Sequence, residues 1–307
     1  MRHKRVFWIL IGNVNTGSSR IHGYNVHKSL LAKGIKSKIL KEGSKPLKFK
    51  EKLKILFLLK KGDLIIFQKR KEFSLRKLLF CLKLKKVKIA FIDCDLPKCN
   101  DSLVHYFDYI IVSSKSLLKL YKEHHPTKKI FYVPDAVEHF IIKKPIFNKK
   151  IIFFGWLTDF RIKKISSLKE IIEPLGWEIY TMSNNSKADI IWNNWSDFET
   201  FKIISQHSVS LIVVDGEASS KYKSANRVLQ SQAIGNIVLC SDIESYREVI
   251  NNGENGYICS TNNEWKNALN QILDINIRDK IIGNGYNTAQ KYKMDEIVLM
   301  WILHLEL

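Results

Sequence analysis

The chain has 307 residues, of which 45% are hydrophobic and 26% are charged, and this is enough material for two domains with ordinary cores. It carries a net charge of +20, and residues 1–150 hold 35 of the 50 Lys and Arg side chains but only 11 of the 30 Asp and Glu side chains. The five cysteines form no Cys-x-x-Cys pair, which argues against a disulfide framework and a zinc site. No apolar run approaches the roughly 20 residues that span a bilayer, which argues against a membrane-spanning protein.

The charge asymmetry suggests that the first half faces a polyanion. Nucleic acid, an anionic membrane and phosphorylated ligands all fit such a surface. A lysine-rich composition that only produces a solvated basic face fits it as well.

Short apolar runs in the first half predict strands, and helical patterns lie between them. The first run, Val6–Ile11, precedes the turn-rich segment Gly12–Gly17 instead of a cleavage site, so we predict a buried strand there and no signal peptide. The further strands predicted are Ser37–Leu40, Leu64–Phe67, Val87–Ile92, Tyr109–Val112 and Ile130–Val133, with helices over Gly23–Lys33, Ser74–Leu84 and Ser116–Glu123.

A second series of strands follows the polar, proline-containing segment Lys143–Asn148, where we place a domain boundary. Its members are Lys150–Phe154, Glu178–Thr181, Ile190–Ile191, Val209–Val214 and Ile237–Cys240. The tail from Ile275 to Leu307 reads mostly as helix, with an apolar stripe through Ile297, Leu299, Met300, Ile302 and Leu303.

This alternation predicts an α/β fold of two tandem Rossmann-like, doubly wound domains with a C-terminal helical tail. We expect the first domain over residues 1–145, the second over 149–285, and a final helix over 286–307 that packs back on the first domain. In such sheets ligands bind at the carboxyl ends of the strands.

The first strand ends in a glycine- and serine-rich turn, Gly12–Arg20. Free backbone amides at the following helix start suit an anion, and Gly17 and Arg20 are the candidates for a phosphate contact. The segment is neither Gly-x-Gly-x-x-Gly nor a P-loop, and strand-to-helix turns also carry glycine for steric reasons.

A second candidate phosphate site lies in Lys221–Gly235. Ser224 is predicted to cap a helix that ends before Gly235, and this places Lys223, Ser224 and Arg227 around its first turn. Helix amides and the helix dipole reinforce positive charge there, which suits a diphosphate. A capped surface helix with solvated basic residues is the alternative.

The segment Lys223-Ser-Ala-Asn-Arg227, followed by Gln-Ser-Gln-Ala-Ile-Gly-Asn-Ile-Val, resembles the donor-binding helix of GT-B glycosyltransferases. The similarity is to the bacterial surface-polysaccharide branch related to family 4. Other segments resemble that branch in the same order, namely Asp63–Arg70, Ile89–Asp95, Tyr109–Ser114, Val133–Glu138, Ile152–Trp156 and Asn252–Tyr257.

The resemblance implies that the second domain holds a nucleotide-sugar donor while the acceptor approaches the first domain. Gly155 would let the backbone approach the donor diphosphate, Arg161 or Lys163 would neutralise it, and no further cofactor is implied. The implied nucleoside and sugar contacts are Ser183, Asn184, Asn226 and Gln230. The chain departs from the Glu-x7-Glu pattern of family 4, because Tyr222 and Gln230 occupy those positions, which puts the usual carboxylate contacts in doubt.

Asp93-Cys-Asp95 and His22 are the candidate catalytic groups. An Asp-x-Asp pair after a strand is also the metal signature of the GT-A fold, but that fold has a single nucleotide-binding domain, so we favour a base or sugar contact without metal. A solvated strand-end turn explains the pair equally well. His22 is a candidate general base, although a lone histidine is more often a surface residue or one whose hydrogen bonds are made within the protein.

The function expected is therefore metal-independent transfer of a sugar from a nucleotide sugar to a growing surface glycan or lipid-linked oligosaccharide, in the cytoplasm at the inner face of the membrane. Two basic amphipathic segments, residues 46–61 and 73–88, suit an anionic lipid surface, or pack on the sheet as ordinary surface helices. The alternatives are a nucleic-acid-binding protein that uses the basic first half, and a non-catalytic sugar-binding protein on the same fold.

Overall fold

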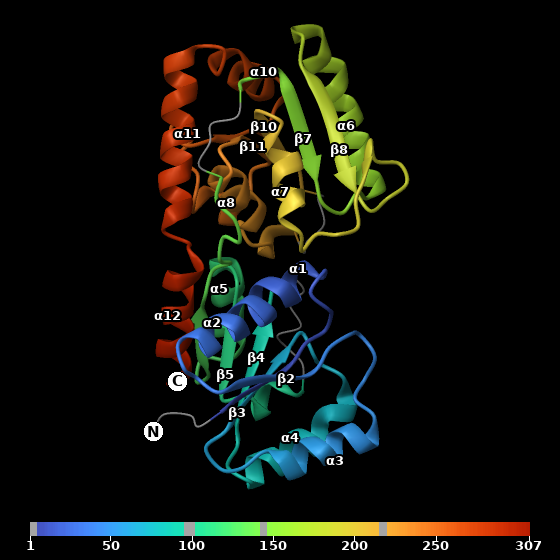
Figure 1. Ribbon diagram of the computed structural model, residues 1–307, viewed down its shortest axis with the longest axis vertical. Helices are drawn as coiled ribbons and strands as arrows, with labels where there is room; N and C mark the ends of the chain where they lie inside the picture. Colours follow the sequence, from blue (N-terminus) through green and yellow to red (C-terminus); the bar gives the residue numbers. More distant parts are fainter. Residues whose placement is uncertain (1–4, 95–101, 142–145, 215–219) are drawn as a thin grey trace. The chain divides into compact units, whose positions relative to one another are not determined.

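The computed structural model describes residues 5–94, 102–141, 146–214 and 220–307, which divide into two compact units (Figure 1). The first unit comprises Met1–Asp135, Tyr222–Ser224 and Met294–Leu307, and the second comprises Ala136–Lys221 and Ala225–Lys293. The division after Asp135 precedes the boundary segment expected from the sequence, residues 143–148, which lies partly outside the described residues.

The first unit is built on a six-stranded parallel sheet with the order β2-β1-β3-β4-β5-β6. This is a doubly wound order, and its switch point lies between β1 and β3. The strands are β1 Val6–Ile9, β2 Ser37–Lys41, β3 Leu64–Gln68, β4 Lys88–Asp93, β5 Tyr109–Val112 and β6 Lys129–Tyr132.

Helices cover both faces of this sheet. Side chains that alternate along the strands, such as Phe7 and Ile65, form a core with α3, α4 and α5 on one face. On the other face Trp8 of β1 packs against Trp301 of α12, with ring centroids 6.0 Å apart, and α12 contacts α2. The helices are α2 Val26–Ala32, α3 Phe49–Leu58, α4 Arg76–Leu84, α5 Lys115–His124 and α12 Met294–Leu305.

The buried side of α12 differs from the apolar stripe predicted for it. Its buried residues are Ile297, Val298, Trp301 and Leu305, which recur at helical spacing. Leu299 and Leu303 are instead 50% and 74% exposed, so their place in the predicted stripe is wrong. The stripe followed apolar residues alone and missed the tryptophan that anchors the helix.

The second unit holds another six-stranded parallel sheet, with the order β12-β11-β10-β7-β8-β9. In chain order this is the 3-2-1-4-5-6 arrangement of dinucleotide-binding folds, and its switch point lies between β7 and β10. The strands are β7 Lys150–Phe154, β8 Glu178–Ser183, β9 Ile190–Ile191, β10 Val209–Ile212, β11 Ile237–Cys240 and β12 Tyr257–Ile258.

Helices also cover both faces of the second sheet. One face packs against α6 and α10 through residues such as Leu168 and Trp265. The other packs against α7 and α8, through Phe201 and Val228, and α11 lies against α8. The helices are α6 Asp159–Ile172, α7 Phe198–Ser205, α8 Asn226–Ala233, α9 Glu244–Arg247, α10 Asn262–Gln271 and α11 Ile275–Gln290.

The predicted fold class, two doubly wound α/β domains with a helical tail, is confirmed. Each strand expected from the sequence has a counterpart among the described residues, and β12 is an addition. Within the described part of the chain, no helix combines the length and the apolar character needed to cross a bilayer.

Candidate functional site

The strongest candidate site lies at the carboxyl end of β7, beside the switch point of the second sheet. Gly155 follows the strand with φ of +126°, a conformation that side-chain-bearing residues rarely adopt. A Cβ added there would lie 3.4 Å from Nη1 of Arg227. The same Nη1 donates a hydrogen bond of 3.2 Å to the carbonyl oxygen of Phe154. Arg227, from the first turn of α8, is thus held against the bare backbone at the strand end.

A second guanidinium reaches the same strand end from α6. Arg161 is 5% exposed, and its Nη1 donates a 2.6 Å hydrogen bond to the carbonyl oxygen of Trp156. The helix starts here because Thr158 caps it, accepting a hydrogen bond from the backbone N–H of Arg161. The start of α6 therefore faces the turn that contains Gly155, with its first amides and a buried arginine together.

Tyr246, next to α8 in the core, is the group that both arginines share. Burial raises the pKa of Tyr246, while Arg227, which hydrogen-bonds the phenol, and Arg161 act to lower it. The positive charges of both arginines therefore act on one buried hydroxyl, and like charges in one place repel each other. An anion at this strand end would relieve that repulsion, and a diphosphate offers the charge and the acceptor oxygens to do so.

Gly155, Arg161 and Arg227, three of the residues predicted to bind the donor diphosphate, are thus brought together. Lys163 is exposed two residues further along α6. These assignments stay predictions, because no ligand contact tests them.

The predicted nucleoside contacts follow β8, the neighbour of β7. Ser183 is buried, and its hydroxyl accepts a hydrogen bond from the backbone N–H of Asn185. Asn185 in turn donates to the carbonyl oxygen of Leu157, which ties this loop to the turn after β7. Asn184 is exposed at the loop surface. The loop is therefore held against the same turn that accepts a hydrogen bond from Arg161.

The start of α8 differs from the prediction. The helix begins at Asn226 with Ala225 as its N-cap, so the cap predicted for Ser224 is wrong. The hydroxyl of Ser224 donates instead to Asp135, at 2.5 Å, within the first unit. The division between the units falls between Ser224 and Ala225, so Lys223 and Arg227 belong to different units. Phosphate binding by Lys223 and Ser224, and sugar binding by Asn226, stay predictions.

Gln230 has a structural task in α8. It is 2% exposed, its Nε2 donates to the carbonyl oxygen of His139 at 2.7 Å, and its Oε1 accepts from the backbone N–H of Glu138 at 2.9 Å. A carboxylate at this position would accept but not donate, so the amide suits this pair of backbone groups. A contact to ribose would compete with these bonds, and the predicted role is not tested.

The glycine-rich turn of the first unit leads into α1 Gly17–Ser19 and then a π-helical turn, Arg20–Asn25. Such turns are rare and often accompany functional sites. A Cβ on Gly17 would meet nothing within 4 Å, so sterics do not require glycine there. Arg20 is 9% exposed and donates to the carbonyl oxygen of Val14, 3.3 Å away. Phosphate binding by both residues stays a prediction.

His22, in the π-helical turn, pairs with Asp135. Its Nε2 lies 2.5 Å from Oδ1 of Asp135, and both side chains are at most 5% exposed. Burial acts to lower the pKa of His22, but Cys94 and Asp135 raise it, and the net pKa lies well above the ordinary value of 6.5. A charged imidazole is a hydrogen-bond donor, and its predicted role as general base is not tested.

Asp93, at the end of β4, is also engaged. Its Oδ2 accepts from Nζ of Lys71 at 3.0 Å and from the hydroxyl of Tyr121 at 2.6 Å. These partners give the buried carboxylate a packing role, while its predicted catalytic role is not tested. Asp95 lies outside the described residues. Within those residues, no group of three His, Cys, Asp or Glu side chains is arranged to hold a metal ion.

Two residues of these arrangements were not assigned from the sequence. Asp135 lies in the segment Val133–Glu138, which was noted only for its resemblance, and its partners His22 and Ser224 are far away in the chain. Tyr246 had no sequence signal, because an aromatic residue in a helical pattern reads as core.

Comparison with known proteins supports the fold. No protein-family model matches the chain, and no curated protein matches it significantly by sequence. Solved structures do match. HepE of Anabaena, solved with UDP and glucose, superimposes with a TM-score of 0.70 at 11% identity, over 99% of this chain and 100% of that chain. A glycosyltransferase of Rickettsia africae superimposes with a TM-score of 0.70 at 13% identity, over 99% of this chain and 98% of that chain.

A third neighbour, the pneumococcal O-GlcNAc transferase GtfA solved with UDP and GlcNAc, gives a TM-score of 0.62 at 16% identity, over 81% of this chain. The chain spans 57% of GtfA, which is less than two thirds of its length. GtfA and the Rickettsia protein are named as transferases, and at such identities the likeness of all three neighbours shows the fold alone. The link to family 4 and to surface polysaccharides stays a prediction.

Proposed function

We propose that the chain is a glycosyltransferase that moves a sugar from a nucleotide-sugar donor to a glycan or lipid-linked oligosaccharide. The observation that carries the proposal is the convergence of Arg161 and Arg227 on the turn at Gly155, at the switch point of a dinucleotide-type sheet. The fold shared with two named transferases, and with HepE solved with UDP and glucose, supports it. The proposed setting is the cytoplasmic face of a membrane.

The chemistry breaks the bond between the anomeric carbon and the donor diphosphate. The acceptor hydroxyl forms the new glycosidic bond and loses its proton, and the nucleoside diphosphate leaves with the bonding electrons. Negative charge therefore grows on the leaving oxygen, where Arg161, Arg227 and the first amides of α6 are proposed to stabilise it. In this proposal side chains supply the positive charge without a metal ion.

Uridine diphosphate is the first nucleotide to test. HepE and GtfA were both solved with UDP and a sugar, and this chain shares their fold. The loop after β8, with Ser183 and Asn184, is proposed to contact the nucleoside. Its link to the turn after β7 supports that assignment, because one ligand would then touch both loops.

The test is a thermal shift with nucleoside diphosphates, nucleoside monophosphates and nucleotide sugars. Ligands that bind only the folded state raise the melting temperature. We expect at least one diphosphate to do so and its monophosphate to do so less. Stabilisation by no member of the set would contradict the proposal.

A non-catalytic sugar-binding protein is the second candidate, and Gln230 favours it. Many family 4 enzymes carry glutamate at the position that the resemblance matches to Gln230, whereas here a neutral amide hydrogen-bonds two backbone groups. The two candidates differ in turnover. Release of nucleoside diphosphate from a bound nucleotide sugar, with or without an acceptor, supports the enzyme, and binding without turnover supports the sugar-binding protein.

A further inference from the structure

Helix α3 has an apolar side that does not face the core. Ile55 is 4% exposed and anchors the helix in the first unit. Phe49, Leu53 and Phe57 recur every four residues and so lie along another side of the helix. They are 73%, 37% and 82% exposed. Exposed lysines accompany this stripe at positions 50 and 54.

Helix α4 repeats the arrangement. Leu78, Leu79 and Leu82 are buried in the core of the first unit. Phe73, which precedes the helix, and Phe80 and Leu84 within it are 68%, 52% and 68% exposed. The exposed basic residues on this helix and its flanks are Arg76, Lys77, Lys83, Lys85 and Lys86.

The two helices lie side by side on the same face of the sheet (Figure 1). Nζ of Lys52 donates to the carbonyl oxygen of Ser74 at 2.6 Å, and Nζ of Lys85 donates to that of Leu56. The first bond joins the starts of the helices and the second joins their ends, so the helices run in the same direction. The inner residues of both helices pack into the core of the first unit, so their exposed residues lie on the sides turned away from that core.

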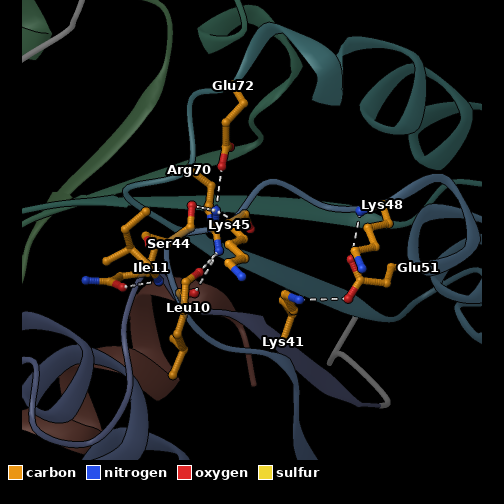
Figure 2. A network of polar contacts seen from close by, with 11 residues as sticks. Leu10, Ile11, Lys41, Ser44, Lys45, Lys48, Glu51, Arg70 and Glu72 are labelled. Carbon is orange, nitrogen blue, oxygen red and sulfur yellow. Dashed lines mark hydrogen bonds and ion pairs between the residues drawn. The ribbon is translucent and has the colours of Figure 1, made fainter.

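A buried arginine fixes the segment that leads into α3 (Figure 2). Arg70 is 1% exposed, and it donates to the carbonyl oxygens of Leu10, Gly43, Ser44 and Lys45. These bonds tie the segment from Gly43 to Lys45 to the end of β1 through one buried side chain. The outer side of α3 is therefore presented by a well-anchored helix.

The acidic side chains of this region are few, and all are in ion pairs. Residues 46–88 contain 15 Lys and Arg side chains and 3 Asp and Glu side chains. Each of the three carboxylates already has a basic partner, which is Lys41 for Glu51, Arg5 for Asp63 and Arg70 for Glu72. The exposed lysines of α3 and α4 therefore form a strongly positive surface around the exposed phenylalanines.

We propose that the outer sides of α3 and α4 dock on an anionic lipid bilayer, with the phenylalanines in the interface and the lysines against lipid phosphates. Basic helices with apolar side chains on one side bind such surfaces by both contributions. A basic surface that only faces water would not require exposed phenylalanines. A surface that binds nucleic acid would use aromatic side chains to stack on bases, but it would not require the aliphatic Leu53 and Leu84. From the sequence, these segments could either pack on the core or dock on a membrane. In the structure, one side of each helix packs on the core, and the other side is proposed to dock on the membrane.

The proposal does not depend on glycosyl transfer, so its test uses vesicles without any glycan. We expect the full chain to co-sediment with vesicles of phosphatidylcholine and phosphatidylglycerol at low salt. Binding should fall by about tenfold or more with phosphatidylcholine alone, and partly at physiological salt, because exposed charges are screened.

Two variants separate the contributions. Phe57→Ala with Phe80→Ala should weaken binding at both salt concentrations, and Lys50→Glu with Lys54→Glu should abolish the preference for anionic lipid. These side chains are exposed, so thermal unfolding should match that of the wild type.

The matched control makes the same kinds of change on α11 of the second unit, Ile275→Ala with Lys280→Glu, both at exposed positions. It should bind vesicles as the wild type does. Three results would overturn the proposal, namely no binding to anionic vesicles at low salt, equal binding by all variants, and binding to an RNA oligonucleotide in place of vesicles.

Discussion

Replacing Arg227 with alanine separates a role in binding a leaving diphosphate from a role in packing. The side chain donates a 3.2 Å hydrogen bond to the carbonyl oxygen of Phe154, contacts Tyr246, and lies over the ring of Phe153 at 5.8 Å from its centroid. Arg227 is half-buried, so we expect a loss of only about 1 kcal/mol in the free energy of unfolding. For a unit of this size that lowers the melting temperature by about 2–4 °C.

The effect on the rate should be much larger. A lost contact to charge that grows in the transition state costs about 2.7–4 kcal/mol, or about a hundredfold to a thousandfold in kcat. The assay follows release of nucleoside diphosphate from the donor that the thermal shift identifies. Arg227→Lys keeps the charge but not the two-pronged geometry, so its rate should be intermediate.

The control is Arg247→Ala, which removes an exposed arginine of the same unit that pairs with Asp242. It should transfer sugar at the wild-type rate. If Arg227→Ala also retains kcat within about threefold of the wild type, Arg227 is an ordinary packing residue and the proposed site is wrong.

Three further predictions test other parts of the structure. Burial acts to lower the pKa of His22, but Cys94 and Asp135 raise it above its value in the unfolded chain. The charged imidazole therefore stabilises the first unit fully below about pH 6.5, the unfolded pKa. This stabilisation is lost as the pH rises through the higher pKa of the folded state. Urea unfolding from pH 6 to 10 should therefore show a steeper loss of stability in the wild type than in His22→Gln, and equal slopes would contradict this pairing. Gln230→Leu leaves two backbone groups of residues 138–139 without their partner, at about 1–3 kcal/mol each, and an unchanged urea midpoint would refute the structural role. A chelator should leave the transfer rate unchanged, and a loss that Mg²⁺ restores would show that a metal takes part.

The sequence predicted the strands well because buried parallel strands are short, nearly continuous apolar runs. It missed β12, whose two residues directly follow the turn-like segment Asn251–Gly256. It also misassigned Leu299 and Leu303 on α12, since apolar character alone does not say which side of a helix meets a sheet.

The candidate site was predictable where it depends on local order. Gly155 directly follows β7, Arg161 lies in the first turn of the next helix, and Arg227 lies in the first turn of α8. The prediction that failed, the N-cap role of Ser224, depends on a partner that is distant in the sequence. The cap expected of Ser224 was reasonable locally, but Asp135 accepts its hydroxyl from 89 residues away in the chain.

The central claim is that the second unit binds the diphosphate of a nucleotide-sugar donor through Arg161 and Arg227. Calorimetric titration of the wild-type chain with UDP, UMP and uridine tests it most directly, with the Arg161→Ala and Arg227→Ala variants measured alongside. We predict that UDP binds at least about tenfold more tightly than UMP, because the second phosphate adds a charge-assisted contact, and that each variant removes most of this difference. Equal affinity for UDP and UMP, or a preference for UDP that survives both substitutions, would contradict the account.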